Sequence, residues 1–413
     1  MFREILHCDL NNFFASVECM LDPSLDGKYV AVCGNTEERH GIVLAKNTAA
    51  KAFGVATGEA IWQAKAKCPE LVTVSPHYSQ YVTYSRIVRR IYSNYTDLVE
   101  PFGIDECWLD VTGSTRLFGS SEKIADAIRQ EVKAETGLTV SVGVSFNKAF
   151  AKLGSDIKKP DAVTVISLEN FKEKVWPLPV FCLLGVGRKT GERMKELGIF
   201  TIGQLALSNP KVISSNFGKC GTQLYLWANG MDNSSVRRIG DDPIPQSVGH
   251  GVTMASDISE AEEARGIFLY LTQEIGHKLI KQNLIAKGVR IGVKDSSLKV
   301  HQFQSALKHP CREPMKLTCE AMKLLVSNYD WEKDVRALTV TAYDLQRETG
   351  EEQTDMFYDL WREEKHGELH KTVDCLRARY GNSCVVPATL LGDMPVSIRD
   401  EESYTPFCRH TSA

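Results

Sequence analysis

The chain has 413 residues, of which 43% are hydrophobic and 24% charged, and its formal net charge is −3. This composition is typical of globular proteins and excludes a disordered chain, while the length predicts three or four domains. Because no basic segment leads into an apolar run and no stretch of about 20 residues is apolar, we expect neither a secretory signal nor a membrane span, and we place the protein in the cytoplasm.

The hydrophobic pattern predicts strands that alternate with amphipathic helices up to residue 168, followed by short-turned helices over 171–230. A linker marked by two prolines then leads into residues 246–345, where strands mix with two long helices. The predicted strands are 1–10, 29–33, 42–45, 98–102, 107–111, 140–144, 163–166, 248–255, 288–294 and 337–343. The predicted helices before residue 168 are 14–20, 49–53, 60–67, 79–96, 121–136 and 148–158. This order indicates an α+β multidomain fold.

Cysteine spacing and charge distribution narrow the possible functions only a little. The twelve cysteines include no C-x-x-C pair, which favours reduced thiols over disulfides or a structural zinc site. Residues 347–413 hold 8 Lys/Arg and 13 Asp/Glu, so the preceding 346 residues carry a net charge of +2. Overall charge therefore neither favours nor excludes a nucleic-acid ligand.

Three carboxylates lie beside apolar strands. Asp9 is near the end of the first strand, and Asp105 and Glu106 open another one directly after Gly103. Buried carboxylates are costly unless they are paired or bind metal, so this arrangement predicts a shared divalent-ion site. Oxygen ligands favour Mg²⁺ or Mn²⁺, and two such ions about 4 Å apart can clamp both oxygens of a phosphoryl transfer. For Asp110 we prefer a turn or surface role.

Adjacent residues of a regular strand point to opposite faces, so Asp105 and Glu106 can share one site only if the backbone there is irregular. Gly103 supplies a flexible corner directly before them. The sequence therefore predicts a local departure from strand geometry at this point.

The segments Asp9–Glu18 and Ile104–Asp110 resemble the two catalytic signatures of Y-family DNA polymerases, in the bacterial DNA polymerase IV and UmuC-like group. Residues 45–55 resemble the fingers motif of this family, and residues 147–160 resemble the motif that closes its palm. Matches recur in order from residue 3 to about 390. The resemblance implies a low-fidelity translesion polymerase that adds dNTPs to a primer 3′ end without proofreading.

The resemblance also implies roles for individual residues. Asp9 and Asp105 would bridge two metal ions, Glu106 would hold the ion that activates the primer hydroxyl, and the Leu10 carbonyl would complete the shell. Phe14 falls at the steric-gate position, where a flat ring excludes a ribose 2′-hydroxyl. The implied substrate-binding residues are Asn12, Phe13, Phe14, Thr48, Lys51 and Lys159.

Two of these residues depart from the family pattern. Thr48 and Lys51 stand where the family usually has Tyr and Arg, which predicts weaker nucleotide binding without loss of a metal ligand. For Phe13, ordinary core packing is an equally good interpretation.

Glycine-rich turns predict contacts to the DNA backbone. Residues 183–191 resemble a helix-hairpin-helix, in which backbone amides and a helix N-terminus hold a phosphate, and residues 217–221 are a weaker match. Plain helix turns and solvated charges remain the alternatives. The DNA-binding candidates are Gly185, Gly187, Arg188, Lys189, Gly218, Gly221, Arg290 and Lys294, with Lys299 as a further basic residue.

Residues 353–357 look like the pentapeptide by which bacterial polymerases dock on the sliding clamp. Gln353 would enter a polar pocket, while Met356 and Phe357 would fill an apolar one. The alternative is a helix start with chance apolar residues.

By the same resemblance the chain is a right-hand polymerase and a monomer that binds primer-template DNA. The expected domains are a palm (1–12 and 76–168), fingers (13–75), a helical thumb (169–232), a linker (233–243), an α/β little finger (244–346) and a clamp-binding tail (347–413). A catalytically silent DNA-bound scaffold is one alternative, and a metal-dependent nucleotide cyclase or other phosphoryl transferase is another. The intact carboxylates argue against the first, and the hairpin argues against the second.

Overall fold

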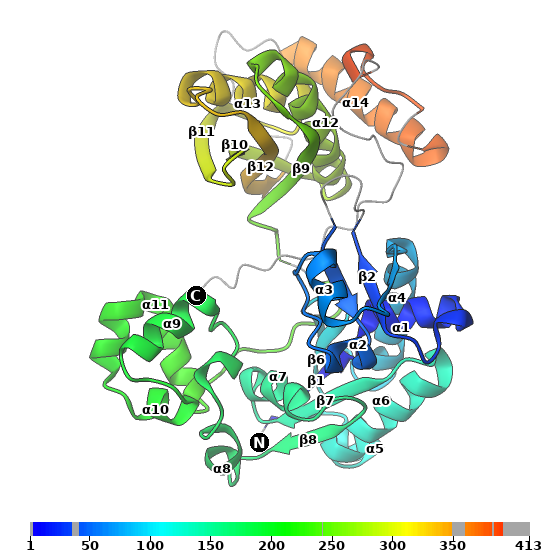
Figure 1. Ribbon diagram of the computed structural model, residues 1–413, viewed down its shortest axis with the longest axis vertical. Helices are drawn as coiled ribbons and strands as arrows, with labels where there is room; N and C mark the ends of the chain where they lie inside the picture. Colours follow the sequence, from blue (N-terminus) through cyan, green and yellow to red (C-terminus); the bar gives the residue numbers. More distant parts are fainter. Residues whose placement is uncertain (1–2, 35–40, 242, 349–359, 382–383, 391–413) are drawn as a thin grey trace. The chain divides into compact units, whose positions relative to one another are not determined.

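The computed structural model describes residues 3–34, 41–241, 243–348, 360–381 and 384–390 (Figure 1). The chain forms two compact units, whose main boundary lies between residues 242 and 243. Within the described ranges, no helix is both long and apolar enough to cross a membrane.

A five-stranded sheet in the order β5-β6-β1-β7-β8 forms the centre of the first unit. Its strands are β1 (Ile5–Leu10), β5 (Val99–Pro101), β6 (Glu106–Asp110), β7 (Val140–Ser145) and β8 (Val163–Ile166). All six residues of β1 are buried, because this strand pairs antiparallel with β6 on one side and β7 on the other. β1 is therefore the strand on which neighbouring elements converge.

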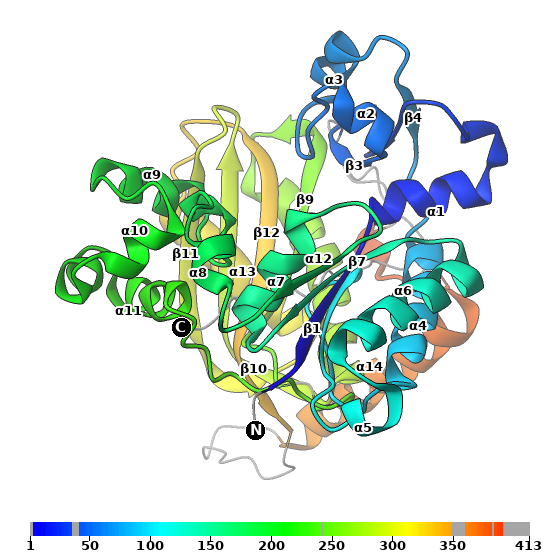
Figure 2. The ribbon, with the colours of Figure 1, turned by 90° about the horizontal axis from the view of Figure 1, so that it is seen from below.

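Helices cover both faces of this sheet (Figure 2). Leu6, Cys8 and Leu10 share a hydrophobic core with α4 (Tyr78–Ser93) and α6 (Ser121–Thr136). The alternate residues of β1 face α7 (Lys148–Ile157), to which His7 and Asp9 are hydrogen-bonded. The polar residues of β1 are thus turned toward α7 by the two-residue period of the strand.

A smaller α/β lobe follows β1 directly. It contains α1 (Phe13–Leu21), the 3₁₀ turn η1 (Pro23–Leu25) and a three-stranded sheet in the order β3-β2-β4. The strands are β2 (Val30–Cys33), β3 (Val43–Lys46) and β4 (Val72–Val74), and the helices α2 (Thr48–Ala52) and α3 (Ile61–Lys67) lie between the last two. Asn47 caps α2 by accepting from the Ala50 amide at 2.9 Å.

Short helices dominate residues 171–228. They are α8 (Phe171–Val175), η2 (Val180–Cys182), α9 (Arg188–Glu196), α10 (Ile202–Leu207) and α11 (Pro210–Ala228), while α5 (Thr115–Phe118) lies earlier, before α6. After α11 the chain returns to the central sheet, where Arg237 forms an ion pair with buried Glu100 at 2.9 Å. The first part of the predicted linker therefore packs on the first unit.

The second unit has an antiparallel sheet in the order β11-β10-β12-β9. Its strands are β9 (Ser247–Ile258), β10 (Leu284–Asp295), β11 (Val300–Cys311) and β12 (Val335–Arg347). Two helices, α12 (Ala261–Lys281) and α13 (Pro314–Asn328), share its hydrophobic core. The last described elements are α14 (Leu360–Tyr380), where Asp374 lies 2.5 Å from His277 of α12, and η3 (Ala388–Leu390).

Most predicted elements agree with the structure to within a few residues, and the helix 121–136 and the strand 163–166 are reproduced without change. Strands β4 and β11 were missed. β11 alternates between exposed and half-buried residues, so it lacks the apolar run that would have marked it. The helix expected over 79–96 ends at Ser93, and strands β9, β10 and β12 are longer than predicted.

The described cysteines are free thiols, as expected. The division into palm, fingers, thumb and little finger stays a prediction.

Candidate active site

Asp9 and Glu106 are cross-strand neighbours in the central sheet. The antiparallel register pairs Asp9 of β1 with Glu106 of β6, and the preceding pair is Cys8 with Cys107. Directly paired residues point to the same face of a sheet. The register therefore brings together two carboxylates that are far apart in sequence, on the face that α7 covers.

Asp105 lies just outside β6, in a tight turn. The amides of Phe102 and Gly103 both reach the Glu106 carbonyl, at 2.9 and 3.4 Å, and the Leu10 amide donates to the Asp105 carbonyl at 3.1 Å. The expected departure from strand geometry is present here, and it holds Asp105 beside the end of β1. Burial, followed by the charges of Glu106 and Asp9, raises the pKa of Asp105 to about 6.

Two lysines contact these carboxylates, one on α7 and one just after it. Lys152 Nζ lies 3.0 Å from Asp9 Oδ2 and 3.1 Å from Glu106 Oε1, and Lys159 Nζ lies 2.8 Å from Asp9 Oδ2. Asp156 pairs with both ammonium groups, at 3.2 and 2.8 Å. Burial opposes the charge on Lys152, but the carboxylates of Asp9 and Glu106 raise its pKa above the ordinary value. The site is thus a cluster of four carboxylates and only two ammonium groups, so negative charge is in excess when all of them are ionised.

Among the described residues, no three His, Cys, Asp or Glu side chains are gathered as a metal site. The geometry supplies a reason, since Lys152 contacts the carboxylates of both Asp9 and Glu106. The donor set nevertheless fits a hard cation. Glu106 Oε2 is buried without a hydrogen-bond partner among the described residues. Burial and then the charges of Glu106 and Asp9 raise the pKa of Asp105, and a divalent ion would oppose both effects.

His7 completes this cluster and was missed in the sequence. Its ring is fully buried, its Nδ1 lies 2.9 Å from Ser155 Oγ, and its Nε2 lies 3.4 Å from Glu106 Oε2. Burial, and then the charge of Lys152, lower the pKa of His7 well below its ordinary value, so the ring is neutral. The available signal was its position two residues before Asp9, on the same face of β1.

Of the predicted nucleotide-binding residues, Asn12, Phe13 and Phe14 lie where β1 passes into α1, whereas Thr48 and Lys51 lie on α2. Asn12 adopts a left-handed conformation, and its Nδ2 donates to Thr48 Oγ1 at 2.8 Å. Phe13 is 3% exposed and its ring packs in the core, which supports the packing interpretation of that side chain. Phe14 is only partly buried, and its ring stacks on Tyr81 at 4.1 Å. Lys51 is exposed.

Known proteins resemble this chain over most of its length. The model of the impB/mucB/samB family matches residues 8–156, and the model of the C-terminal domain of that family matches residues 245–356. A protein of Acetivibrio thermocellus called DNA polymerase IV is 46% identical over 394 residues, which cover 95% of this chain and 98% of the relative. The chain belongs to the Y family of DNA polymerases.

Within the Y family, the relatives belong to the bacterial DNA polymerase IV group. DNA polymerase IV 1 of Bacillus subtilis is 35% identical over 93% of this chain and 92% of its own length. The solved Y-family DNA polymerase chimera Dbh-Dpo4(243-245)-Dbh shares the fold, with a TM-score of 0.74 over 84% of this chain and all of the chimera, at 24% identity. The predicted family, fold class and enzyme class, a DNA-directed DNA polymerase of translesion synthesis, are confirmed. Y-family polymerases use divalent metal ions.

The first predicted hairpin of this Y-family chain lies between η2 and α9. Gly185 has φ +86° and Gly187 precedes the first residue of α9, so a tight turn leads into a helix N-terminus. Arg188 is 89% exposed at its side chain and forms an ion pair with Glu192 of its own helix, at 2.9 Å. Lys189 is also exposed. This geometry leaves both basic side chains on the surface.

The second predicted hairpin is a break within α11. Gly218 has φ +61°, which separates two helical segments. Gly221 has a different role, because a Cβ there would lie 2.5 Å from Phe217 Cβ, so it permits close packing of the second segment. The two glycines therefore shape one turn.

On one face of the second unit, four rows of described residues contain no carboxylate. Val289, Ile291, Leu338 and Val340 point into the helix-covered core, so the residues between them point away from it. Those outward residues form four rows across the sheet: Ser247, Tyr343, Gly288 and Ala306; Gly249, Thr341, Arg290 and Gln304; Gly251, Thr339, Gly292 and Gln302; Thr253, Ala337, Lys294 and Val300. These rows carry two positive charges and no negative one. We call this surface the open sheet face.

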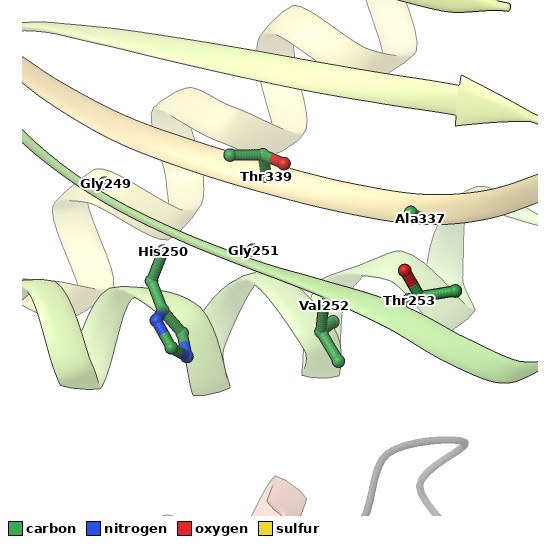
Figure 3. Close-up of a pocket in the computed structure, with 7 residues that line it drawn as sticks. All are labelled: Gly249, His250, Gly251, Val252, Thr253, Ala337 and Thr339. Atoms are coloured by element: carbon green, nitrogen blue, oxygen red, sulfur yellow. The ribbon is translucent and has the colours of Figure 1, made fainter. Parts of the chain in front are cut away.

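The open sheet face has a hollow at its edge. A hollow of about 330 Å³ is lined by residues of β9 and β12, namely Gly249, His250, Gly251, Val252, Thr253, Ala337 and Thr339 (Figure 3). Arg290 is held beside it by a 2.9 Å hydrogen bond to Gln304 and by the Tyr343 ring at 5.4 Å. Lys294 lies two rows further along β10 than Arg290, and Lys299 lies beyond the end of that strand. The predicted clamp-binding pentapeptide, with Gln353, Met356 and Phe357, lies outside the described residues.

Proposed function

We propose that the chain extends a primer on a DNA template by a two-metal-ion nucleotidyl transfer and has no proofreading activity. The observation that carries this proposal is the pairing of Asp9 with Glu106 beside Asp105, with the ammonium groups of Lys152 and Lys159 turned to the same carboxylates. A cluster of this kind binds divalent cations and a triphosphate together.

Asp9, Asp105, Glu106 and the Leu10 carbonyl would hold the ions, with Mg²⁺ as the natural choice and Mn²⁺ as a substitute. Bound there, the ions would activate the primer 3′-hydroxyl and neutralise charge on the leaving pyrophosphate. The residues of the chain itself do the rest of the positioning. Lys159 has 30% of its side chain exposed and supplies a point charge for the incoming triphosphate.

The choice of sugar is assigned to Phe14. Its ring is partly open, whereas the ring of Phe13 is enclosed, so only Phe14 can lie against a bound nucleotide. A ring in van der Waals contact with C2′ of the sugar leaves no volume for a hydroxyl, and deoxynucleotides are therefore preferred. Asn12 and Thr48, which are hydrogen-bonded to each other, would line the same nucleotide, and Lys51 would add charge.

DNA would be held without reading its sequence. The open sheet face offers Arg290 and Lys294 among small neutral residues, and the turn at Gly185 and Gly187 offers backbone amides and Arg188. Such contacts go to phosphates and position the duplex. Primer-template DNA and dNTPs are thus the proposed substrates.

The test is primer extension on a defined template with Mg²⁺ and each dNTP in turn. The wild type should extend the primer with the templated base, and Asp105→Ala/Glu106→Ala should lose extension while still binding duplex. Asp110→Ala is the matched control. Its carboxylate caps a local turn by accepting from Thr112 N at 3.0 Å and Oγ1 at 2.6 Å, so extension should persist. Duplex binding without any extension by the wild type would instead support the silent scaffold.

We also propose that residues 353–357 bind the sliding clamp. This rests on their sequence and on their position directly after β12, the last strand of the second unit. Deleting Gln353–Phe357 should leave distributive synthesis intact and abolish stimulation by the clamp. Unchanged stimulation would show that the clamp binds elsewhere.

A further inference from the structure

One face of the Phe14 ring packs against a second aromatic ring. Tyr81, on α4, is completely buried and stacks on Phe14 with the ring centroids 4.1 Å apart and the planes 10° from parallel. Tyr78, one turn earlier on α4, meets the edge of Phe14 at 6.0 Å. One face of the Phe14 ring is therefore covered by the ring of Tyr81.

Tyr81 is in turn fixed by a buried carboxylate. Glu18 is 3% exposed, and its Oε1 accepts hydrogen bonds from the Tyr81 hydroxyl and from the His77 amide, the latter at 3.1 Å. The His77 ring nitrogen Nδ1 lies 2.9 Å from Glu18 Oε2. Burial and this hydrogen bond raise the pKa of Tyr81, so the phenol stays protonated and remains the donor. A carboxylate buried to this degree is stable only with its donors in place.

The two residues that contact Tyr81 at its ring and at its hydroxyl lie on one helix. Phe14 and Glu18 are four residues apart on α1, so they project from the same face of it, one turn apart. The Tyr81 ring packs against the first of these side chains, and its hydroxyl is bound to the second. Any tilt or retreat of the Tyr81 ring must therefore break or stretch the bond to Glu18.

We propose that Glu18 and Tyr81 are positioning residues that hold the sugar-selecting ring of Phe14 against displacement, and so set the discrimination between deoxyribonucleotides and ribonucleotides. This inference rests on the proposed function of Phe14. Excluding a hydroxyl group requires a wall that does not yield by the width of one oxygen atom. The stacked ring anchored to Glu18 supplies the stiffness, which a half-exposed phenylalanine lacks by itself.

The experiment measures kcat/KM for dCTP and for CTP opposite a template guanine, in the wild type, Tyr81→Phe and Glu18→Gln. Tyr81→Phe keeps the stacked ring and removes only the hydroxyl. Its dCTP/CTP ratio should fall by about tenfold, the order of one hydrogen bond to a charged group, mostly through a higher kcat/KM for CTP. Glu18→Gln should lower the ratio similarly, and the double variant should add little because both changes remove the same bond.

The matched control is Tyr95→Phe. Tyr95 donates to Glu131 at 2.5 Å and is partly buried in the same unit, but its ring packs against Phe118, whereas the Tyr81 ring packs against Phe14. The substitution therefore removes another tyrosine–glutamate bond without changing the ring that stacks on Phe14. Thermal unfolding of all variants shows whether their losses of stability are comparable. A purely structural role of Tyr81 would lower stability as Tyr95→Phe does and leave the dCTP/CTP ratio alone.

The variant Phe14→Ala distinguishes a failure of the positioning proposal from a failure of the proposed function of Phe14. If this variant admits CTP while Tyr81→Phe and Glu18→Gln keep the wild-type ratio, Phe14 is the gate but the positioning proposal is wrong. If Phe14→Ala itself excludes CTP as well as the wild type does, the proposed function of Phe14 is wrong, and the inference about Glu18 falls with it.

Discussion

A glycine in β7 sets the distance between α7 and the central sheet. Gly143 lies directly opposite His7 in the register, on the face that α7 covers. A Cβ atom built there would lie 1.9 Å from the Ala151 carbonyl oxygen and 2.5 Å from the Ser155 amide nitrogen, whereas real Cβ atoms essentially never approach within 3.0 Å. Gly143→Ala must therefore push α7 outward by about 1 Å, because both obstacles are backbone atoms of that helix.

This displacement of α7 should affect both the stability of the protein and the rate of catalysis. Overpacking of this severity costs about 3 kcal/mol, which corresponds to about 6–12 °C in the unfolding midpoint of a unit of this size. The same shift moves Lys152 and Ser155 away from Glu106 and His7, and misplacement of catalytic groups by about 1 Å costs on the order of a hundredfold in rate. We expect Gly143→Ala to lose both stability and primer extension.

Thermal unfolding and single-nucleotide incorporation measure the two effects on the same preparations. Gly113→Ala is the control, because a Cβ there meets nothing within 4 Å. Gly154→Ala should be intermediate, since its nearest neighbour is Gly143 Cα at 3.0 Å. A Gly143→Ala variant that melts within about 2 °C of the wild type and extends primers normally would refute the close-packing argument.

Three further predictions concern the charged groups. The folded protein raises the pKa of Asp105 from 3.8 to about 6, so the contribution of protonated Asp105 to the stability of the metal-free protein is full below pH 3.8 and is lost as the pH rises through about 6. Urea unfolding in EDTA should show this loss of stability, and Asp105→Asn should remove it. Lys159→Ala should raise the KM for dNTPs about tenfold or more, in steady-state incorporation, with a smaller change in kcat. Replacing both Arg290 and Lys294 by Ala should weaken duplex binding and reduce the slope of log Kd against log salt concentration by about 2, whereas Lys323→Ala on α13 should not.

Sequence alone determined the local features of this protein. Period-two and helical patterns located most strands and helices, since these depend on which side chains a nearby surface must bury. The apolar strand ending at Asp9 and the adjacent carboxylates after Gly103 marked the candidate metal site, because unpaired buried charge is too costly to occur by chance. The irregular backbone at Asp105 was also foreseen, from the strand period itself.

Only the tertiary structure decided how these pieces meet. The register that pairs Asp9 with Glu106 and the approach of α7, which turns Lys152 onto both of them, depend on contacts between segments far apart in the chain. The same is true of His7 behind Glu106 and of the arrangement that joins Glu18, Tyr81 and Phe14. Sequence periodicity indicates that a side chain is buried, but the identity of its neighbour is chosen by packing across the whole core, and that choice creates the site.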